Sequence, residues 1–264
     1  MADLLTFTDK GMYCPQGDFY IDPWKPVEQA LITHAHADHA RWGHQHYMAT
    51  ASSAPVMRHR LGDIDLQTTP YTAKPRIGDV DVSFHPAGHV PGSAQIRIEH
   101  KGQVLVAAGD YKIVDDGLSE PFETVKCHAF ITESTFGLPV FKWTPQDILA
   151  AQINEWWAKN ASQGRVSILT AYALGKAQRL LSLVDANIGP ILTHAAIENT
   201  NEILRAQGFQ FAPTERVTKD TDTKTRRNAL VLATPSALGM GWGKRFGDHS
   251  TAFASGWMAL RGVR

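Results

Sequence analysis

The sequence predicts an α/β protein that has two differently organised parts. In the first part, short apolar runs alternate with glycine and proline, which is typical of strands joined by tight turns. From Thr144 onward, amphipathic stretches of helical period alternate with short apolar runs, which is typical of a unit of helices and strands in succession. A chain of 264 residues can form one domain with an insertion or two separate domains, so length alone leaves both open.

Five strands are predicted in the first part of the chain. Val80, Val82 and Phe84 alternate with polar residues, so this strand is expected to be half-buried. The run VLVAA at 104–108 is apolar throughout, so this strand is expected to be central in its sheet. The five predicted ranges are 30–33, 80–85, 95–99, 104–108 and 129–132.

Three helices are predicted in the second part. The first is expected to have Thr144 as its N-cap and Pro145 at its first position, and to end near Lys159. Trp156 and Trp157 lie on its apolar face, which favours packing in the core over stacking with bases. The remaining predictions are helices at 177–184 and 198–206, strands at 166–169 and 229–233, and a solvated loop at 214–228.

The composition argues against a membrane protein and against secretion. Apolar residues make up 43% of the chain, and no apolar run reaches about 18 residues, the length that spans a bilayer. The N-terminus lacks the apolar stretch of a secretory signal, so a cytoplasmic location is expected. Cys14 and Cys127 have no CxxC partner, which argues against a disulfide framework and a thiolate zinc site. With a net charge of zero, nucleic acid would have to be held by local charge and metal ions.

The most informative motif is LITHAHADHA, in which three histidines and an aspartate directly follow a predicted strand. In an extended chain, His34 and His36 project to one side. A turn at Asp38 and His39 then brings a carboxylate and a third imidazole to a second position nearby. Neutral imidazoles and carboxylates suit Zn²⁺, while Mn²⁺ or Fe²⁺ can also bind such a set. A solvated histidine-rich turn is the alternative interpretation.

Two later residues complete the predicted ligand set. His89 follows the alternating strand, within FHPAGHVPGSA, and Asp110 ends the apolar run VLVAAGD. Glycines beside both residues allow the backbone turns that direct such side chains. We predict a binuclear metal centre in which Asp38 and His39 bind the second metal and Asp110 bridges both metals. The first metal is bound by His34, His36 and His89.

These residues resemble the metallo-β-lactamase superfamily, in which an HxHxDH motif, a downstream GH pair and a strand-terminal aspartate occur in this order and spacing. Three further segments resemble the β-CASP nucleases of that superfamily. They are ITESTFG at 131–137, YALGKAQRLL at 172–181 and ATPSALGMGWG at 233–243. Within that group, essentially the whole chain is similar to the bacterial ligase-associated DNA exonuclease family, which is related to the DNA cross-link repair nucleases.

The resemblance implies a fold, two residues that support the metal site, and the cofactors and partners. The implied fold is α/β: a metallo-β-lactamase αββα sandwich at 1–141, with an inserted β-CASP-like α/β cap at 142–264. Glu133 matches the first acidic β-CASP motif and would fix the tautomer of a ligating histidine, which makes it, with Asp38, a predicted catalytic side chain. Asp22, in YIDPW, would support the metal-binding loop without ligating metal. The implied cofactors are two Zn²⁺ ions, with Mn²⁺ as a substitute, and the implied protein partners are a DNA ligase and a helicase.

Members of this family continue beyond the position that corresponds to Arg264, back into the lactamase fold. The resemblance implies that this further segment supplies two histidines, one that ligates the second metal and one that acts near the leaving group. His194 and His249, in the predicted cap, are not expected to replace them. The chain is therefore expected to be a fragment or a weakened enzyme, and the second metal is the part of the prediction that depends on those histidines.

The ligand set predicts phosphodiester hydrolysis by a hydroxide that two divalent cations activate, with Asp38 orienting the nucleophile. By the resemblance, the substrate is DNA, and degradation starts at a 5′ end during DNA repair. Substrate contacts are predicted at Lys176, Ser236 and Lys244. The turn at 172–176 opens a helix, so its N–H groups and Lys176 either bind a phosphate or simply cap that helix.

Three other functions stay open. An RNA-processing nuclease of the same fold would use the same chemistry, because the metal motif does not distinguish the two sugars. A small-molecule hydrolase fits the metal motif but gives no reason for the α/β segment after residue 142. A non-catalytic nucleic-acid-binding fragment would bind one metal ion or none, whereas an intact site would bind about two, so metal analysis distinguishes these cases.

Overall fold

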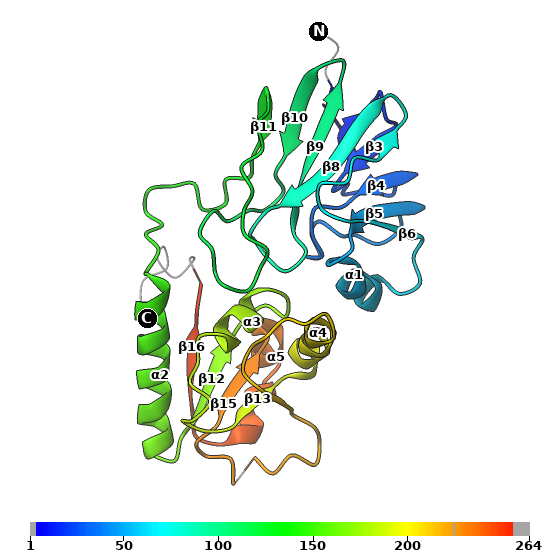
Figure 1. Cartoon of the computed structure of the whole chain (residues 1–264). Helices are drawn as coiled ribbons and strands as arrows, with labels where there is room; N and C mark the ends of the chain where they lie inside the picture. Colours follow the sequence, from blue (N-terminus) through cyan, green and yellow to red (C-terminus); the bar gives the residue numbers. More distant parts are fainter. Residues whose placement is uncertain (1–3, 224, 256–264) are drawn as a thin grey trace. The chain divides into compact units, whose positions relative to one another are not determined.

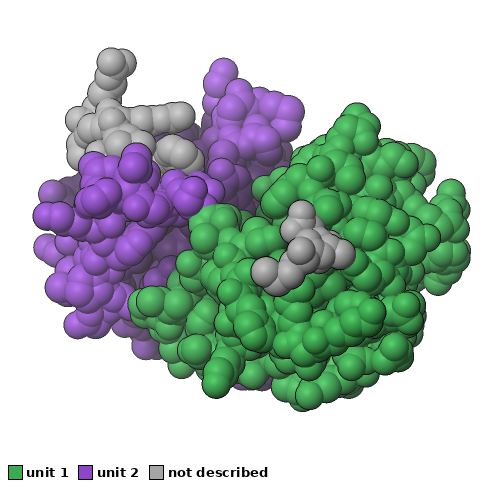
Figure 2. Space-filling model, turned by 90° about the horizontal axis from the view of Figure 1, so that it is seen from above, with its two compact units in different colours: residues 1–133 green, residues 134–264 purple. Residues whose placement is uncertain are grey.

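A computed structural model describes residues 4–223 and 225–255 of the chain (Figure 1). The chain divides into two compact units, residues 1–133 and residues 134–264 (Figure 2). The boundary at 141 and 142 that the sequence suggests stays a prediction. Among the described residues, no helix is both long and apolar enough to cross a membrane.

The first sheet of unit 1 has six strands that follow one another in chain order. The first three strands pair antiparallel, and the pairs from β3 to β6 are parallel. Helix α1 (Ala54–Leu61) makes the connection between β5 and β6. The strands are β1 (Thr6–Thr8), β2 (Gly11–Cys14), β3 (Phe19–Ile21), β4 (Gln29–Leu31), β5 (His46–Thr50) and β6 (Leu66–Thr69).

The second sheet of unit 1 has the order β11-β10-β9-β8-β7, and it contains four of the five strands predicted in this part of the chain. Strand β10, which carries the apolar run, has a neighbour on each side, as expected, although β9 occupies the middle. Only the pair of β10 and β11 is parallel. The strands are β7 (Arg76–Ile77), β8 (Val80–Pro86), β9 (Ala94–His100), β10 (Gln103–Ala107) and β11 (Ala129–Ile131).

The expectation that β8 is half-buried was wrong for its second half. Ser83 and His85, on the face opposite to Val82 and Phe84, are also buried. The imidazole of His85 bonds to Ser83 Oγ at 2.9 Å through Nε2 and to Glu123 Oε1 at 3.0 Å through Nδ1. Polar residues are therefore tolerated on this face because they bond to one another.

The core of unit 1 lies between its two sheets. One cluster of buried apolar side chains takes members from both, such as Ile21 and Leu31 from the first sheet and Phe84 and Ile96 from the second. Two sheets packed face to face over a shared core are the central part of the predicted αββα sandwich. Within the described part of this unit, residues 4–133, α1 is the one α-helix, so the outer helical layers of the predicted sandwich are represented here by a single helix.

Unit 2 is built on an all-parallel sheet with the order β14-β13-β15-β12-β16. Its strands are β12 (Val166–Thr170), β13 (Ile191–Thr193), β14 (Glu215–Arg216), β15 (Leu230–Ala233) and β16 (His249–Phe253). Its helices are α2 (Gln146–Ser162), α3 (Lys176–Leu181), α4 (Ala195–Ala206), α5 (Pro235–Gly239) and the 3₁₀ helix η1 (Trp242–Phe246). The strand and helix alternation that the sequence predicts is confirmed.

The two faces of the parallel sheet carry separate apolar cores. On one face, Trp157 of α2 is fully buried against residues of α3 and of the central strands, so its predicted core packing is confirmed. Trp156 is partly buried in the same cluster and donates from Nε1 to Ser250 Oγ at 3.1 Å. On the other face, Phe246 of η1 packs with Ile168 and Val231. Burial on both faces explains why these strands are almost entirely apolar.

Three details of unit 2 differ from the predictions. Helix α2 begins at Gln146, with Pro145 as its N-cap in an extended conformation, so Thr144 is not the cap. The expected loop at 214–228 contains the short strand β14, which pairs with β13 through Leu192 and Thr193. Elements α5, η1 and β16 were not predicted, because their sequences lack a regular apolar period.

Glu198 of α4 is a buried carboxylate that joins α4 to β13 and to the residue before β14 through hydrogen bonds. Its Oε2 accepts from Thr193 Oγ1 at 2.6 Å and from Thr214 Oγ1 at 2.7 Å, and its Oε1 pairs with Arg205 Nη1 at 3.0 Å. Burial raises the pKa of Glu198, but these hydrogen bonds, with one from Asn201 and the charge of Arg205, outweigh burial and lower the pKa overall.

The lowered pKa of Glu198 predicts an acid-dependent loss of stability. Because the pKa is lower in the folded chain than the value of about 4.3 in an unfolded one, the carboxylate stabilises the fold above that pH and loses its effect as the pH falls. We expect Glu198→Gln to lower the free energy of unfolding at pH 7 by about 2 kcal/mol, and less at pH 4. Urea unfolding at both pH values measures this difference. Glu202→Gln is the control, since Glu202 is an exposed residue of the same helix. An equal loss at both pH values would contradict the assignment.

Candidate metal centre

Three predicted histidine ligands come together in unit 1 from two separate parts of the chain. His34 and His36 follow β4, and His89 follows β8. Nδ1 of His36 lies 3.0 Å from Nε2 of His34 and 3.3 Å from Nε2 of His89. His34 is completely buried, whereas the other two are partly exposed. The three imidazoles thus present nitrogen atoms to a common point.

Asp110 adds a carboxylate to the three histidines. It follows β10, which is antiparallel to β9 as β8 is, so β8 and β10 end at the same edge of the second sheet. Asp110 Oδ2 lies 3.5 Å from His89 Nε2. Ligand atoms of His34, His36, His89 and Asp110 all lie within 4.8 Å of one another. Three imidazoles and one carboxylate at these separations fit a tetrahedral Zn²⁺ site, and the same donors accept Mn²⁺.

His39 and Asp38 lie on the other side of Asp110. His39 Nε2 is 3.4 Å from Asp110 Oδ1 and 3.8 Å from Asp38 Oδ2. The Asp38 side chain is 72% exposed, so it is open to solvent. Asp110 therefore directs one oxygen toward His89 and the other toward His39, which is the arrangement that a bridging carboxylate requires. The second metal and the bridge stay predictions.

Asp22 lies behind the histidines and holds the loop that carries them. Its Oδ1 accepts from the backbone N–H of Thr33 at 2.8 Å, and its Oδ2 accepts from Thr33 Oγ1 at 2.5 Å. The same Oδ2 lies 2.7 Å from Nδ1 of His39. A carboxylate on the second ring nitrogen fixes the tautomer of a histidine, so Nε2 of His39 is left to face Asp110.

Thr33 is a supporting residue that the sequence analysis missed. Besides bonding to Asp22, its Oγ1 lies 3.1 Å from Nδ1 of His34. A Cβ atom on Gly109, whose φ is +58°, would lie 2.5 Å from the same oxygen. Glycine at 109 thus lets the backbone that precedes Asp110 approach Thr33 directly.

The charges of the site differ between its two sides. Burial lowers the pKa of His34 strongly and that of His89 to about 4, and the neighbouring histidines add to both effects. Burial also lowers the pKa of His39, but its hydrogen bonds to Asp110 and Asp22 outweigh burial and raise the pKa to about 10. Metal binding requires neutral imidazole. His34 and His89 are therefore ready to bind a cation, whereas a cation beside His39 has to displace a proton.

The other predicted site residues are placed by their own elements. Glu133 follows β11, and its backbone carbonyl accepts from Thr132 Oγ1 at 2.7 Å. The predicted bond from its side chain to a ligating histidine stays a prediction. Lys176 begins α3, with its Nζ 5.7 Å from the centre of the Tyr172 ring. Ser236 lies in α5, where its Oγ is 3.1 Å from Thr234 Oγ1, and Lys244 lies in η1. All three lie in unit 2, and their contacts with substrate stay predictions.

His194 and His249 have local roles in unit 2. Nδ1 of His194 accepts from the backbone N–H of Ala196 and caps α4. His249 begins β16, and its Nδ1 lies 2.6 Å from the carbonyl oxygen of Gly247. These contacts account for both residues without a metal.

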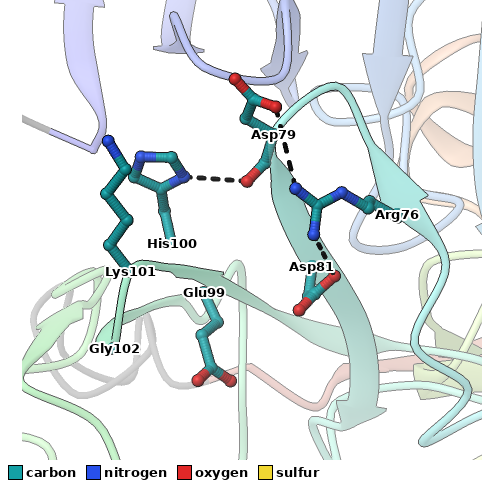
Figure 3. A pocket seen from close by; sticks show the side chains of 7 residues that line it. All are labelled: Arg76, Asp79, Asp81, Glu99, His100, Lys101 and Gly102. Atoms are coloured by element: carbon teal, nitrogen blue, oxygen red, sulfur yellow. Dashed lines mark hydrogen bonds and ion pairs between the residues drawn. The ribbon is translucent and has the colours of Figure 1, made fainter.

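A polar cavity of about 390 Å³ lies at the far end of the second sheet (Figure 3). Its walls come from β7, the turn into β8 and the start of β8, together with the end of β9 and the turn into β10. This is the end of the sheet opposite to His89 and Asp110. Arg76 pairs there with Asp79 and Asp81, as Figure 3 shows. The cavity is therefore separate from the metal centre.

The fold and the site define an α/β protein with a histidine and aspartate cluster that suits a metal ion. No family model matches the chain. Over 94% of its length, the chain is 29% identical to a probable DNA ligase from Opitutus terrae. It is 23% identical over 67% of its length to an RNase J-like protein from Methanocaldococcus jannaschii, and 27% identical over 62% to a ribonuclease from Thermus thermophilus.

The chain corresponds to only part of each relative. The aligned region makes up 24% of the probable DNA ligase, 48% of the RNase J-like protein and 44% of the ribonuclease. The chain is therefore similar to two proteins named as ribonucleases and to one named as a DNA ligase, which agrees with a resemblance to the β-CASP nucleases of the metallo-β-lactamase superfamily. The resemblance that the sequence motifs indicated is thereby confirmed.

Proposed function

We propose that the chain is the metal-binding part of a nuclease that hydrolyses phosphodiester bonds of DNA from a 5′ end. The observation that carries this proposal is the convergence of His34, His36, His89 and Asp110 within 4.8 Å. The similarity to proteins named as ribonucleases and as a DNA ligase supports nucleic acid as the substrate class. The proposed setting is DNA repair in the cytoplasm.

The proposed division of labour follows the positions of the side chains. His34, His36, His89 and Asp110 would hold one divalent cation, and Asp38 and His39 would hold a second one with Asp110 between them. When bound, such cations supply a water molecule of lowered pKa and positive charge for the phosphoryl oxygens. Asp38, the most exposed of these side chains, would accept a hydrogen bond from the attacking water and orient it. Asp22 would keep His39 in the tautomer that faces the cation.

Unit 2 is proposed to be the β-CASP cap, which binds the nucleic acid. Its candidate contacts are Lys176, Ser236 and Lys244, which would bind phosphate oxygens through an ammonium group or a hydroxyl. Lys176 is partly buried, and burial lowers its pKa. A phosphate beside Lys176 would stabilise the charged ammonium group that burial disfavours, because it would provide the opposite charge.

The relatives support DNA and RNA as the substrate to different extents. The alignment that covers nearly the whole chain is with a probable DNA ligase, and this supports both DNA as substrate and a DNA ligase as partner. A helicase as second partner is proposed from the family resemblance alone. The shorter alignments are with an RNase J-like protein and a ribonuclease, so an RNA-processing nuclease is the second candidate.

Digestion of matched oligonucleotides tests the proposal. Single-stranded DNA and RNA of one sequence, labelled at the 5′ end, are incubated with the Zn²⁺- or Mn²⁺-loaded chain. We expect labelled mononucleotides from DNA at the earliest times, since an enzyme that starts at the 5′ end releases the label first. Faster digestion of RNA would favour the second candidate. Binding without digestion of either substrate, in a chain shown to be loaded with metal, would contradict a nuclease function.

A further inference from the structure

The segment 111–123, which follows Asp110, lies against the turn 87–93, which carries His89. Lys112 donates its backbone N–H to the carbonyl oxygen of Ala87 at 2.9 Å, and Glu123 donates to that of Pro86 at 3.1 Å. The Gln95 side chain joins the two parts again, since its Nε2 donates to the carbonyl oxygens of Pro86 and Glu123. Both ends of the segment are therefore attached to the end of β8.

The backbones of the two parts touch beside the predicted ligand. Gly88, which precedes His89, has a φ of +72°. A Cβ atom at this position would lie 2.1 Å from the carbonyl oxygen of Lys112 and 3.2 Å from the backbone nitrogen of Phe122. Only a residue without a side chain fits, so the position of His89 depends on the position of segment 111–123.

Glu120 connects the middle of the segment to the same turn. Its Oε2 accepts from the backbone N–H of Gly92 at 2.8 Å. From the other side, Thr50 Oγ1 donates to the carbonyl oxygen of Gly92 at 2.7 Å, and Ser93 Oγ accepts from the backbone N–H of His89 at 3.1 Å. A carboxylate that accepts from a backbone N–H forms one of the stronger hydrogen bonds in proteins.

The segment has its own internal support, which places Glu120. Asp116 is buried, and its Oδ1 accepts from the backbone N–H groups of Leu118 at 3.1 Å and Ser119 at 2.9 Å. Its Oδ2 pairs with the Lys112 ammonium group. The chain therefore makes a closed loop between Lys112 and Ser119, and Glu120 leaves that loop facing the His89 turn.

We propose that Glu120 is a positioning residue that holds His89 at the correct distance from Asp110. This proposal rests on the metal centre proposed above. Asp110 is two residues from Lys112, so the segment that Glu120 attaches to the His89 turn is continuous with the backbone of Asp110. The separation of 3.5 Å between His89 Nε2 and Asp110 Oδ2 is then set by one connected unit. Without the Glu120 bond, the part of the turn that follows His89 would lose its attachment to segment 111–123, and His89 would be held less firmly.

Metal titration of three variants tests the proposal. Glu120→Ala removes the acceptor, Glu120→Asp keeps the charge but is one methylene too short to reach Gly92, and Glu120→Gln keeps an acceptor oxygen at the same distance. We expect Zn²⁺ affinity to fall about 10- to 100-fold in the alanine and aspartate variants, as is usual when support of a ligand is lost, and to stay within about threefold in the glutamine variant. The d–d absorption of bound Co²⁺ should shift in the two weakened variants.

The controls separate this proposal from the one on which it rests. Glu99→Ala removes the same charge at the far end of the second sheet and should leave Zn²⁺ affinity unchanged. Absence of Zn²⁺ binding by the unaltered chain would refute the metal centre itself. Normal Zn²⁺ affinity in Glu120→Asp, or equal losses in Glu120→Gln and Glu120→Asp, would overturn the role of Glu120 while leaving the metal centre intact. If Glu120→Ala does not fold, the comparison of Zn²⁺ affinity between Glu120→Asp and Glu120→Gln still tests the role of Glu120.

Discussion

Replacing His36 with alanine should remove the proposed nuclease activity together with the proposed metal. Nδ1 of His36 lies 3.0 Å from His34 Nε2 and 3.3 Å from His89 Nε2, so this nitrogen is the shared neighbour of the other two imidazoles. Its loss leaves the first metal position with two imidazoles and one carboxylate. We expect the chain to lose the ion that His34, His36, His89 and Asp110 would hold. The rate of phosphodiester hydrolysis should fall by at least about a hundredfold, the cost of losing one group that stabilises charge in a transition state.

Elemental analysis of the purified chain and digestion of labelled DNA check the two effects. His46→Ala is the matched control, because His46 is an exposed histidine of the same unit that pairs with Asp65 and lies outside the ligand cluster. This variant should keep both its metal and its activity. A His36→Ala chain with unchanged metal content and turnover would show that the cluster is not the active site.

The ligand cluster could be predicted from sequence because each ligand is fixed by a local rule. His34 and His36 share one side of an extended chain, and His89 and Asp110 each follow a strand that its apolar pattern reveals. His89 and Asp110 follow β8 and β10 of the second sheet, whereas His34 follows β4 of the first, so residues that are 76 positions apart, such as His34 and Asp110, come together from two different sheets. The structure confirms this proximity, while the metal-binding roles await the experiments above.

The residues that support the cluster could not be predicted in the same way. Thr33 and Glu120 are ordinary residue types whose importance comes from one hydrogen bond to a partner 11 or 28 positions away. No period or motif marks such a pair. Asp22 was identified only through the family resemblance, although its contacts with Thr33 and His39 are among the shortest in the site.

The fold was predicted best where a strand is buried and apolar. Strands β8, β9 and β10 were recognised from their patterns, whereas β1, β2 and β3 were missed. The latter have three or four residues each, and they exist because they pair with one another and pack over the shared core. Such strands are stabilised by tertiary contacts, which local propensity does not report. The same reason explains β16, whose polar sequence HSTAF pairs along the whole of β12.

Gly88→Ala should disturb the metal centre without altering any ligand. The new methyl group would lie 2.1 Å from the carbonyl oxygen of Lys112, a backbone atom that cannot move aside alone, and the φ of +72° is strained for alanine. We expect a loss of about 3–5 kcal/mol in the free energy of unfolding, from the strain of the left-handed conformation and from overpacking. Zn²⁺ affinity should fall as well, because the His89 turn can relieve the clash only by moving away from segment 111–123.

Gly102→Ala isolates the close contact from the backbone strain. Gly102 has a similar φ of +79° in the turn between β9 and β10, and a Cβ atom there would have no neighbour within 4 Å. This variant should lose only about 1–2 kcal/mol, the cost of the left-handed conformation, and should keep its Zn²⁺ affinity. Urea unfolding and Zn²⁺ titration are therefore carried out on both variants. The difference between their free energies of unfolding, and between their Zn²⁺ affinities, gives the effect of the contact between the His89 turn and Lys112. Equal losses in the two variants would mean that this contact does not hold His89 in place, because strain alone would then account for both.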